Sequence, residues 1–201
     1  MATANVFDNI ITQGVRSGQI PARTNDARNW YRDTASNYGK VNERKLMRDG
    51  SDRLTSTILP GSMYMYHYTP KYKDTLPFYD RFPLIFPFRV ESDRFWGLNL
   101  HYLPLTYRAK LMDALYDLAN NTRFDESTRL RLSYSTLQRA AKFRYFAPCV
   151  KQYLKNQMDS RFLYIYPSEW DIALFLPTER FQKATKTRVH AMSKQMLTGQ
   201  R

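Results

Sequence analysis

The alternation of apolar and polar positions changes character along the chain. In its middle and late parts, short aromatic runs of strand length are bounded by prolines and other turn residues, a pattern that favours strands over helices. These runs are SMYMYHY at 62–68, PLIFPFRV at 83–90, FWGLNLHYL at 95–103, RFLYIYP at 161–167 and WDIALFLP at 170–177. Residues 90–94 are predicted to form a hairpin loop between two of them. We therefore expect several short strands in a small sheet.

Other segments carry the spacing of an amphipathic helix. After Pro104, Thr106 is a candidate N-cap for a helix with one apolar face. That face carries Tyr107, Leu111, Leu115 and Leu118. Good helix formers predict a helix at 43–53, and Ser127–Tyr145 predicts one or two basic helices, with a short helix following through Lys155. A last helix is predicted with a loose apolar stripe formed by Phe181, Val189, Met192 and Met196.

The order of these elements predicts an α+β fold. Its centre is a small bent antiparallel sheet or partial barrel, built from the aromatic, proline-punctuated strands and flanked by basic helices. We divide the chain into an N-terminal arm with one helix (1–55), an α+β core (56–178) and a C-terminal basic helix and tail (179–201). Residues 1–26 are polar and broken by glycine and proline, so we expect an extended arm, and arms of this kind become ordered on binding neighbouring subunits.

Composition narrows the class of protein. The 201 residues are 43% hydrophobic and 15% aromatic, which excludes a disordered chain. No stretch approaches the roughly 18 apolar residues of a membrane span, and the first residues lack the features of a secretory signal, so we expect neither membrane insertion nor export. A single cysteine, Cys149, excludes an intrachain disulfide.

The charge of +13 is unevenly distributed and points to an anionic partner. Residues 56–121 carry a net charge of +1, whereas 122–160 and 178–201 each carry +5. A solvated basic surface would also explain this excess. The candidate nucleic-acid-binding residues, which would hold duplex phosphates and read no bases, are Arg123, Arg129, Arg131, Arg139, Lys142, Arg144, Lys151, Lys155, Lys183, Lys186, Arg188 and Lys194.

A second aromatic and basic mixture precedes this region. Tyr64, Tyr66 and Tyr68 alternate along one run, with Tyr72, Tyr79, Lys71, Lys73 and Arg81 close behind. Such rings stack on bases in proteins that bind single strands, but alternating tyrosines also pack within sheets, and we favour the packing role.

The residues do not assemble a catalytic motif. His67, His101 and His190 lie far apart without metal-binding spacing, and Cys149 lies in an apolar setting typical of an inert thiol. There is no glycine-rich phosphate loop. GluArgLys at 43–45 is similar to the last element of a nuclease signature, but no acidic partner precedes it at the right spacing. We expect no enzyme activity, no metal site and no cofactor.

The central run resembles proteins of large contractile-tailed phages. The strings that carry the likeness are MYxYxYxPKxKDxLPxYDxFPLIFP from residue 63, GLNLHYLP at 97–104, PCVKxYL at 148–154 and WDIALFLPxExF at 170–181. This set is similar to the T-even-type DNA end protector family over about 63–182, outside the N-terminal arm. The resemblance implies a virion protein that caps the ends of the packaged genome against host exonuclease, and it carries over no site residue.

These observations support three hypotheses. The first is a non-enzymatic DNA end protector or head-completion protein that holds duplex DNA near genome termini. The second is a structural subunit of the phage neck, tail or baseplate, held by contacts with other virion proteins. The third is a metal-dependent nuclease. For the first two we expect a location in the virion, with host cytoplasm during assembly.

Overall fold

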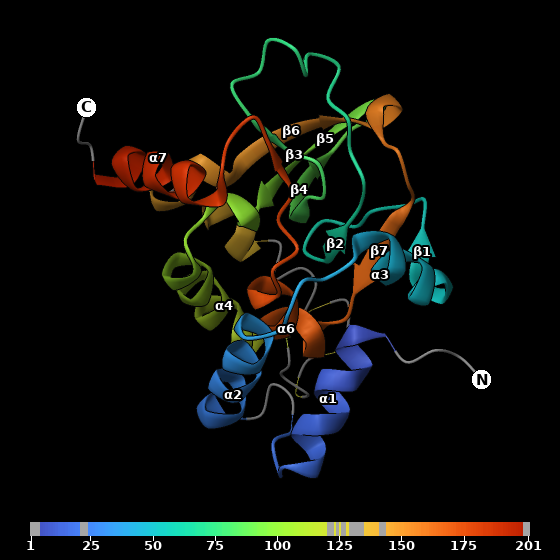
Figure 1. Cartoon of the computed structure of the whole chain (residues 1–201), viewed down its shortest axis with the longest axis vertical. Helices are drawn as coiled ribbons and strands as arrows, with labels where there is room; N and C mark the ends of the chain where they lie inside the picture. Colours follow the sequence, from blue (N-terminus) through green and yellow to red (C-terminus); the bar gives the residue numbers. More distant parts are fainter. Residues whose placement is uncertain are drawn as a thin grey trace.

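Two β-sheets and a set of helices make up the computed structural model of the chain, which describes residues 5–20, 24–119, 123, 125, 128, 135–140 and 144–198. The larger sheet has six antiparallel strands in the order β1-β7-β2-β4-β5-β6 and is not closed (Figure 1). Its strands are β1 (Leu54–Thr55), β2 (Met63–Met65), β4 (Leu84–Val90), β5 (Arg94–Asn99), β6 (Val150–Leu154) and β7 (Phe162–Ile165). A separate pair joins β3 (Tyr79–Asp80) to β8 (Phe181–Gln182). The predicted α+β class with an antiparallel sheet is confirmed.

The large sheet curls around a cluster of aromatic side chains. Phe95 on β5 and Phe162 on β7 are separated by two strands, a distance of about 14 Å on a flat sheet. Their ring centroids nevertheless lie 5.7 Å apart, with Tyr66 in edge contact with both. Tyr64, Tyr66 and Tyr68 are all buried. They therefore pack inside the bend and do not offer rings to a nucleic acid.

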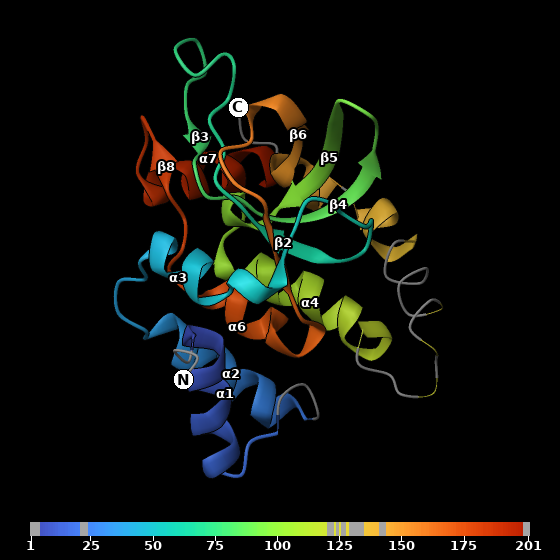
Figure 2. The ribbon, with the colours of Figure 1, turned by 90° about the vertical axis from the view of Figure 1, so that its right-hand side faces the viewer.

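Helices cover the opposite face of the sheet in two layers (Figure 2). The inner layer holds α4 (Leu105–Ala119) and α6 (Trp170–Phe175), and the Trp170 ring meets the edge of Phe86 at 4.8 Å. The outer layer holds α1 (Val6–Arg16) and α2 (Asn25–Ser36). Two further α-helices are α3 (Glu43–Asp49) and α7 (Lys186–Thr198). Short 3-10 helices span Ser51–Arg53, Leu100–Tyr102, Arg144–Cys149, Lys155–Gln157 and Pro167–Glu169.

In the described residues of the N-terminal segment (1–55) there are three α-helices, where one helix was expected. Each begins at a capping side chain: Asn5 accepts a hydrogen bond from the Asp8 amide, Thr24 from Ala27, and Asn42 from Lys45. Phe7 and Ile10 of α1 are 1% exposed and belong to the main core cluster. Much of the expected extended arm is therefore a helix that packs on the chain's own core.

Two element predictions were wrong. Val150–Leu154 is strand β6 and not a helix, because it pairs with the edge of β5 and buries Tyr153 in the aromatic cluster. Residues 170–175 form helix α6 and not a strand, because a short, fully buried apolar run has no polar positions to reveal its period.

The predicted apolar stripe of the last helix was correct only at Val189. On α7, the buried positions are Val189, Ser193 and Leu197, whereas Met192 and Met196 are 37% and 59% exposed. Phe181 lies outside this helix, in β8. Among the described residues, no helix is both long and apolar enough to cross a bilayer.

The guanidinium of Arg108 on α4 is fully buried and connects several elements. It donates to the carbonyls of His101, Leu103 and Leu174 at 3.2, 2.8 and 2.7 Å. Its anionic partner is Glu179, at 2.6 Å, which also pairs with Lys186 on α7. Burial acts to raise the pKa of Glu179, but Arg108, His101 and Lys186 outweigh it and hold this pKa well below its usual value.

A second network of buried charge holds the outer helices to the inner ones. Arg28 and Arg32 on α2 pair with Asp113 on α4 and with Asp171 on α6, at distances of 2.7–3.1 Å. Because each buried cation has a carboxylate partner, the network fixes α2 against α4 and α6.

A substitution at Gly14 tests how closely α1 packs on α2. An added Cβ would clash with the Tyr31 ring, whose hydroxyl is fixed by donating to the Gln19 carbonyl at 2.8 Å. Gly14→Ala should therefore lower the free energy of unfolding by about 1–2 kcal/mol despite the better helix propensity of alanine. The control is Gly39→Ala, where no atom lies within 4 Å of the new Cβ. Equal stability of the two variants in urea unfolding would contradict this packing.

Glu179→Gln removes the anionic partner of the buried Arg108. We expect the free energy of unfolding at pH 7 to fall by about 3 kcal/mol. The folded pKa of Glu179 lies below its ordinary value of 4.5, so its contribution is present above pH 4.5 and is lost as the pH falls toward the folded pKa. The difference in the free energy of unfolding between wild type and variant, measured by urea unfolding, should therefore narrow below pH 4.5. A difference in this free energy that stays constant across the pH range would contradict the pairing of Glu179 with Arg108.

Candidate nucleic-acid interface

Four of the predicted DNA-binding cations have partners within the fold. Lys151 lies 4.2 Å from the Tyr102 ring centroid, and burial lowers its pKa. Lys155 donates to the Glu91 carbonyl, Lys183 donates to the Asp74 and Leu76 carbonyls, and Lys186 pairs with Glu179. These ammonium groups already have structural roles.

Three other predicted cations are exposed and have no hydrogen bond or ion pair to their side chains within the described part of the chain. They are Arg139, Arg188 and Lys194. The last two lie on α7, which packs against the 3-10 helix Arg144–Cys149. Arg123 is also exposed. Arg129, Arg131 and Lys142 lie outside the described residues, as does the side chain of Arg144.

A line of hydrogen bonds in the core has the residue types of a hydrolase triad. Asp80 lies 2.7 Å from Nδ1 of His101, whose Nε2 lies 3.1 Å from the Thr178 hydroxyl. All three side chains are at most 3% exposed, so no substrate reaches them. They connect β3, the 3-10 helix at 100–102 and the chain before β8. Cys149 is fully buried, and burial raises the pKa of its thiol to about 12.

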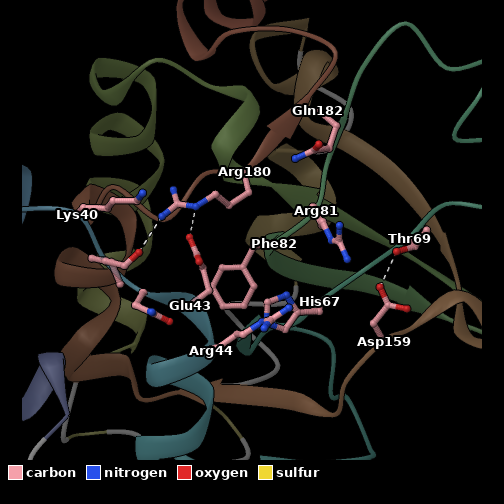
Figure 3. A pocket seen from close by; sticks show the side chains of 12 residues that line it. Lys40, Glu43, Arg44, His67, Thr69, Arg81, Phe82, Asp159, Arg180 and Gln182 are labelled. Carbon is pink, nitrogen blue, oxygen red and sulfur yellow. Dashed lines mark hydrogen bonds and ion pairs between the residues drawn. The ribbon is translucent and has the colours of Figure 1, made fainter.

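A pocket of about 840 Å³, lined by charged side chains, is formed by segments distant in sequence (Figure 3). It lies between the start of α3, the segment that follows β2 and the β3–β8 pair. Its lining residues are Lys40, Val41, Asn42, Glu43, Arg44, His67, Thr69, Arg81, Phe82, Asp159, Arg180 and Gln182.

The two carboxylates of the pocket have partners inside it. Glu43 forms an ion pair with Arg180, whose guanidinium also donates to the Val41 carbonyl at 2.7 Å. Asp159 accepts a hydrogen bond of 2.5 Å from the Thr69 hydroxyl. Figure 3 shows both interactions on opposite sides of the pocket. The acidic groups are therefore engaged in holding the walls together.

Three cations of the pocket have no such partner. Within the described chain, the side chains of Lys40, Arg44 and Arg81 make no hydrogen bond or ion pair, and all three are exposed. The pKa of His67 is lowered, chiefly by burial, and Arg81 and Arg44 lower it further while Glu43 and Asp159 act in the opposite direction. His67 is thus within electrostatic reach of cations from two walls.

Sequence reasoning missed this site. Arg81 was considered only among the tyrosines, and no spacing in the chain relates residues 40–44 to 81 or 180. The nuclease-like Glu43 is paired with Arg180. In the described ranges, no group of three His, Cys, Asp or Glu side chains is placed to hold a metal ion.

Comparison with known proteins assigns the chain to a family. The family model described as Phage T4 terminal DNA protecting protein matches residues 2–197. The match extends beyond the 63–182 region of the resemblance and includes the N-terminal helices. Searches of curated proteins and of solved structures gave no significant match. The chain therefore belongs to the phage T4 terminal DNA protecting protein family.

Proposed function

We propose that this protein is a non-enzymatic virion protein that holds duplex DNA near the ends of the phage genome and excludes exonucleases by covering those ends. Family membership is the observation that carries the proposal. Its place would be the virion, as an end protector or head-completion component, after assembly in the host cytoplasm.

The distribution of charge supports contact with phosphates. Asp113 and Asp171 are engaged by buried arginines, and Glu179 by the buried Arg108 and by Lys186. Among the described residues, none of these carboxylates pairs with Arg188 or Lys194 on α7 or with the pocket residues Lys40, Arg44 and Arg81, which remain available to an external anion. Phosphate contacts of this kind give affinity without base specificity, and a protector of ends needs no sequence preference beyond the terminus.

A structural role among other virion proteins is the second candidate. Met192 and Met196 are exposed one turn apart on α7, on the helix face that also carries Arg188. Flexible apolar side chains next to cations also suit an acidic protein surface. In this alternative the protein is a subunit of the neck, tail or baseplate and does not touch DNA.

Binding of the full chain to linear duplex DNA, measured by fluorescence anisotropy over a series of salt concentrations, tests the proposal. We expect affinity to fall steeply with salt and linear DNA to bind better than closed circles of the same sequence. Arg188→Gln with Lys194→Gln should lower the salt slope by about 2, since each phosphate contact contributes about 0.9.

The control is Arg16→Gln on α1, which lies at the opposite end of the molecule from α7 (Figure 1) and should leave the slope unchanged. Absence of duplex binding at low salt would overturn the proposal and favour the structural subunit. Shortening of the DNA after addition of magnesium would instead favour the nuclease hypothesis.

A further inference from the structure

The pocket between α3 and the β3–β8 pair is hollow and is lined by cations from several segments. Its lining contains four cations, Lys40, Arg44, Arg81 and Arg180, and two carboxylates, which leaves a formal surplus of two positive charges. Its volume of about 840 Å³ lies within the range of ligand pockets. Such a hollow admits the end of a nucleic-acid strand but not a length of duplex.

The walls of the pocket are held in place before any ligand binds. The backbone of Arg81 bridges two segments: its amide donates to the Arg180 carbonyl at 2.9 Å, and its carbonyl accepts from the Tyr68 amide at 3.0 Å. Arg180 is in turn fixed by Glu43 and by the Val41 carbonyl. Because these links join all three walls, the exposed guanidinium groups are carried by a preorganised frame, which reduces the entropic cost of binding.

The surplus charge matches one chemical group of a DNA end. An internal phosphodiester carries one negative charge, whereas a terminal phosphomonoester carries about −1.5 to −2 at pH 7 and offers three strong acceptor oxygens. Guanidinium groups bind such oxygens with paired, charge-assisted hydrogen bonds. Arg44 and Arg81 line the pocket with His67 from different walls, and in the described part of the chain neither side chain has an ion pair (Figure 3).

We propose that this pocket binds the terminal phosphate of a DNA strand, with Arg44 and Arg81 as its main ligands and Lys40 and Arg180 at its sides. The inference rests on the proposed function and specifies how the protein distinguishes an end from the interior of a duplex. Cations on α7 hold the backbone of any duplex, whereas the pocket recognises a group that exists only at a terminus.

The test uses the full chain and duplexes closed by a hairpin at one end. The open end carries a 5′-phosphate, a 3′-phosphate or hydroxyl groups only, and a dumbbell without ends is the fourth ligand. We expect wild type to bind one of the phosphate ends about tenfold more tightly than the hydroxyl end. The two phosphate ligands identify which strand terminus enters the pocket.

Two double variants with the same change in charge separate the two surfaces. Arg44→Gln with Arg81→Gln should abolish the preference for the phosphate end while leaving salt-dependent binding to the dumbbell. Arg188→Gln with Lys194→Gln should weaken binding to all four duplexes alike and keep the preference. All four side chains are exposed, and thermal unfolding of each variant checks that the fold is retained.

Equal binding of phosphate and hydroxyl ends by wild type would overturn the inference, as would a preference that survives in the Arg44 and Arg81 variant. Either result leaves the proposed function intact, because duplex binding persists. A phosphorylated trinucleotide, compared with its unphosphorylated form by thermal shift, tests the pocket independently. If the protein binds no duplex but is stabilised by the phosphorylated trinucleotide alone, the proposed function fails while the phosphate site stands. If neither binds, both are wrong.

Discussion

A charge that is buried in the fold must have a partner, and this requirement organises the molecule. The fully buried guanidinium of Arg108 is satisfied by three carbonyls and by Glu179, and it thereby joins α4, the segment at 101–103 and the end of α6. Arg28 and Arg32 meet the same requirement through Asp113 and Asp171. These pairs contribute specificity of arrangement as much as stability, because an unpaired member would be strongly destabilising. They engage Asp113, Asp171 and Glu179, while the exposed Lys40, Arg44, Arg81, Arg188 and Lys194 place positive charge on the surface.

The placement of the exposed cations relates the fold to the DNA-protecting family to which the chain belongs. The curled sheet and its helical layers supply a rigid frame, and two of its groups of exposed cations differ in arrangement. Those on α7 lie along an open helix surface, suited to the repeated single charges of a duplex backbone. Those around the α3 pocket converge on a hollow, suited to a compact group of higher charge. A protein that protects DNA ends needs both kinds of contact, since one gives affinity for DNA and the other distinguishes its termini.

Most strands of the large sheet could be predicted from the sequence, but the pocket beside α3 could not. Proline-bounded aromatic runs marked β2, β4, β5 and β7, because strand length and turn residues are local properties. The helix at 170–175 escaped prediction because a fully buried run shows no period. Strand β6 escaped because its identity depends on pairing with β5, which lies about fifty residues earlier in the sequence. The pocket could not be predicted at all: Arg44, Arg81 and Arg180 meet only through tertiary contacts. Of the predicted cations, sequence also could not separate Lys151, which packs on Tyr102, from Lys194, which is exposed.

We propose that this protein protects DNA ends by occupying them, without changing a covalent bond. The most direct measurement is the survival of a long linear duplex exposed to a processive exonuclease, with and without saturating full-chain protein. We expect the DNA to be recovered at full length, protection to be lost when high salt is added before the nuclease, and DNA released from the protein to carry its original ends. Degradation at the same rate with and without the protein, or recovery of a trimmed product from the protein alone, would contradict it.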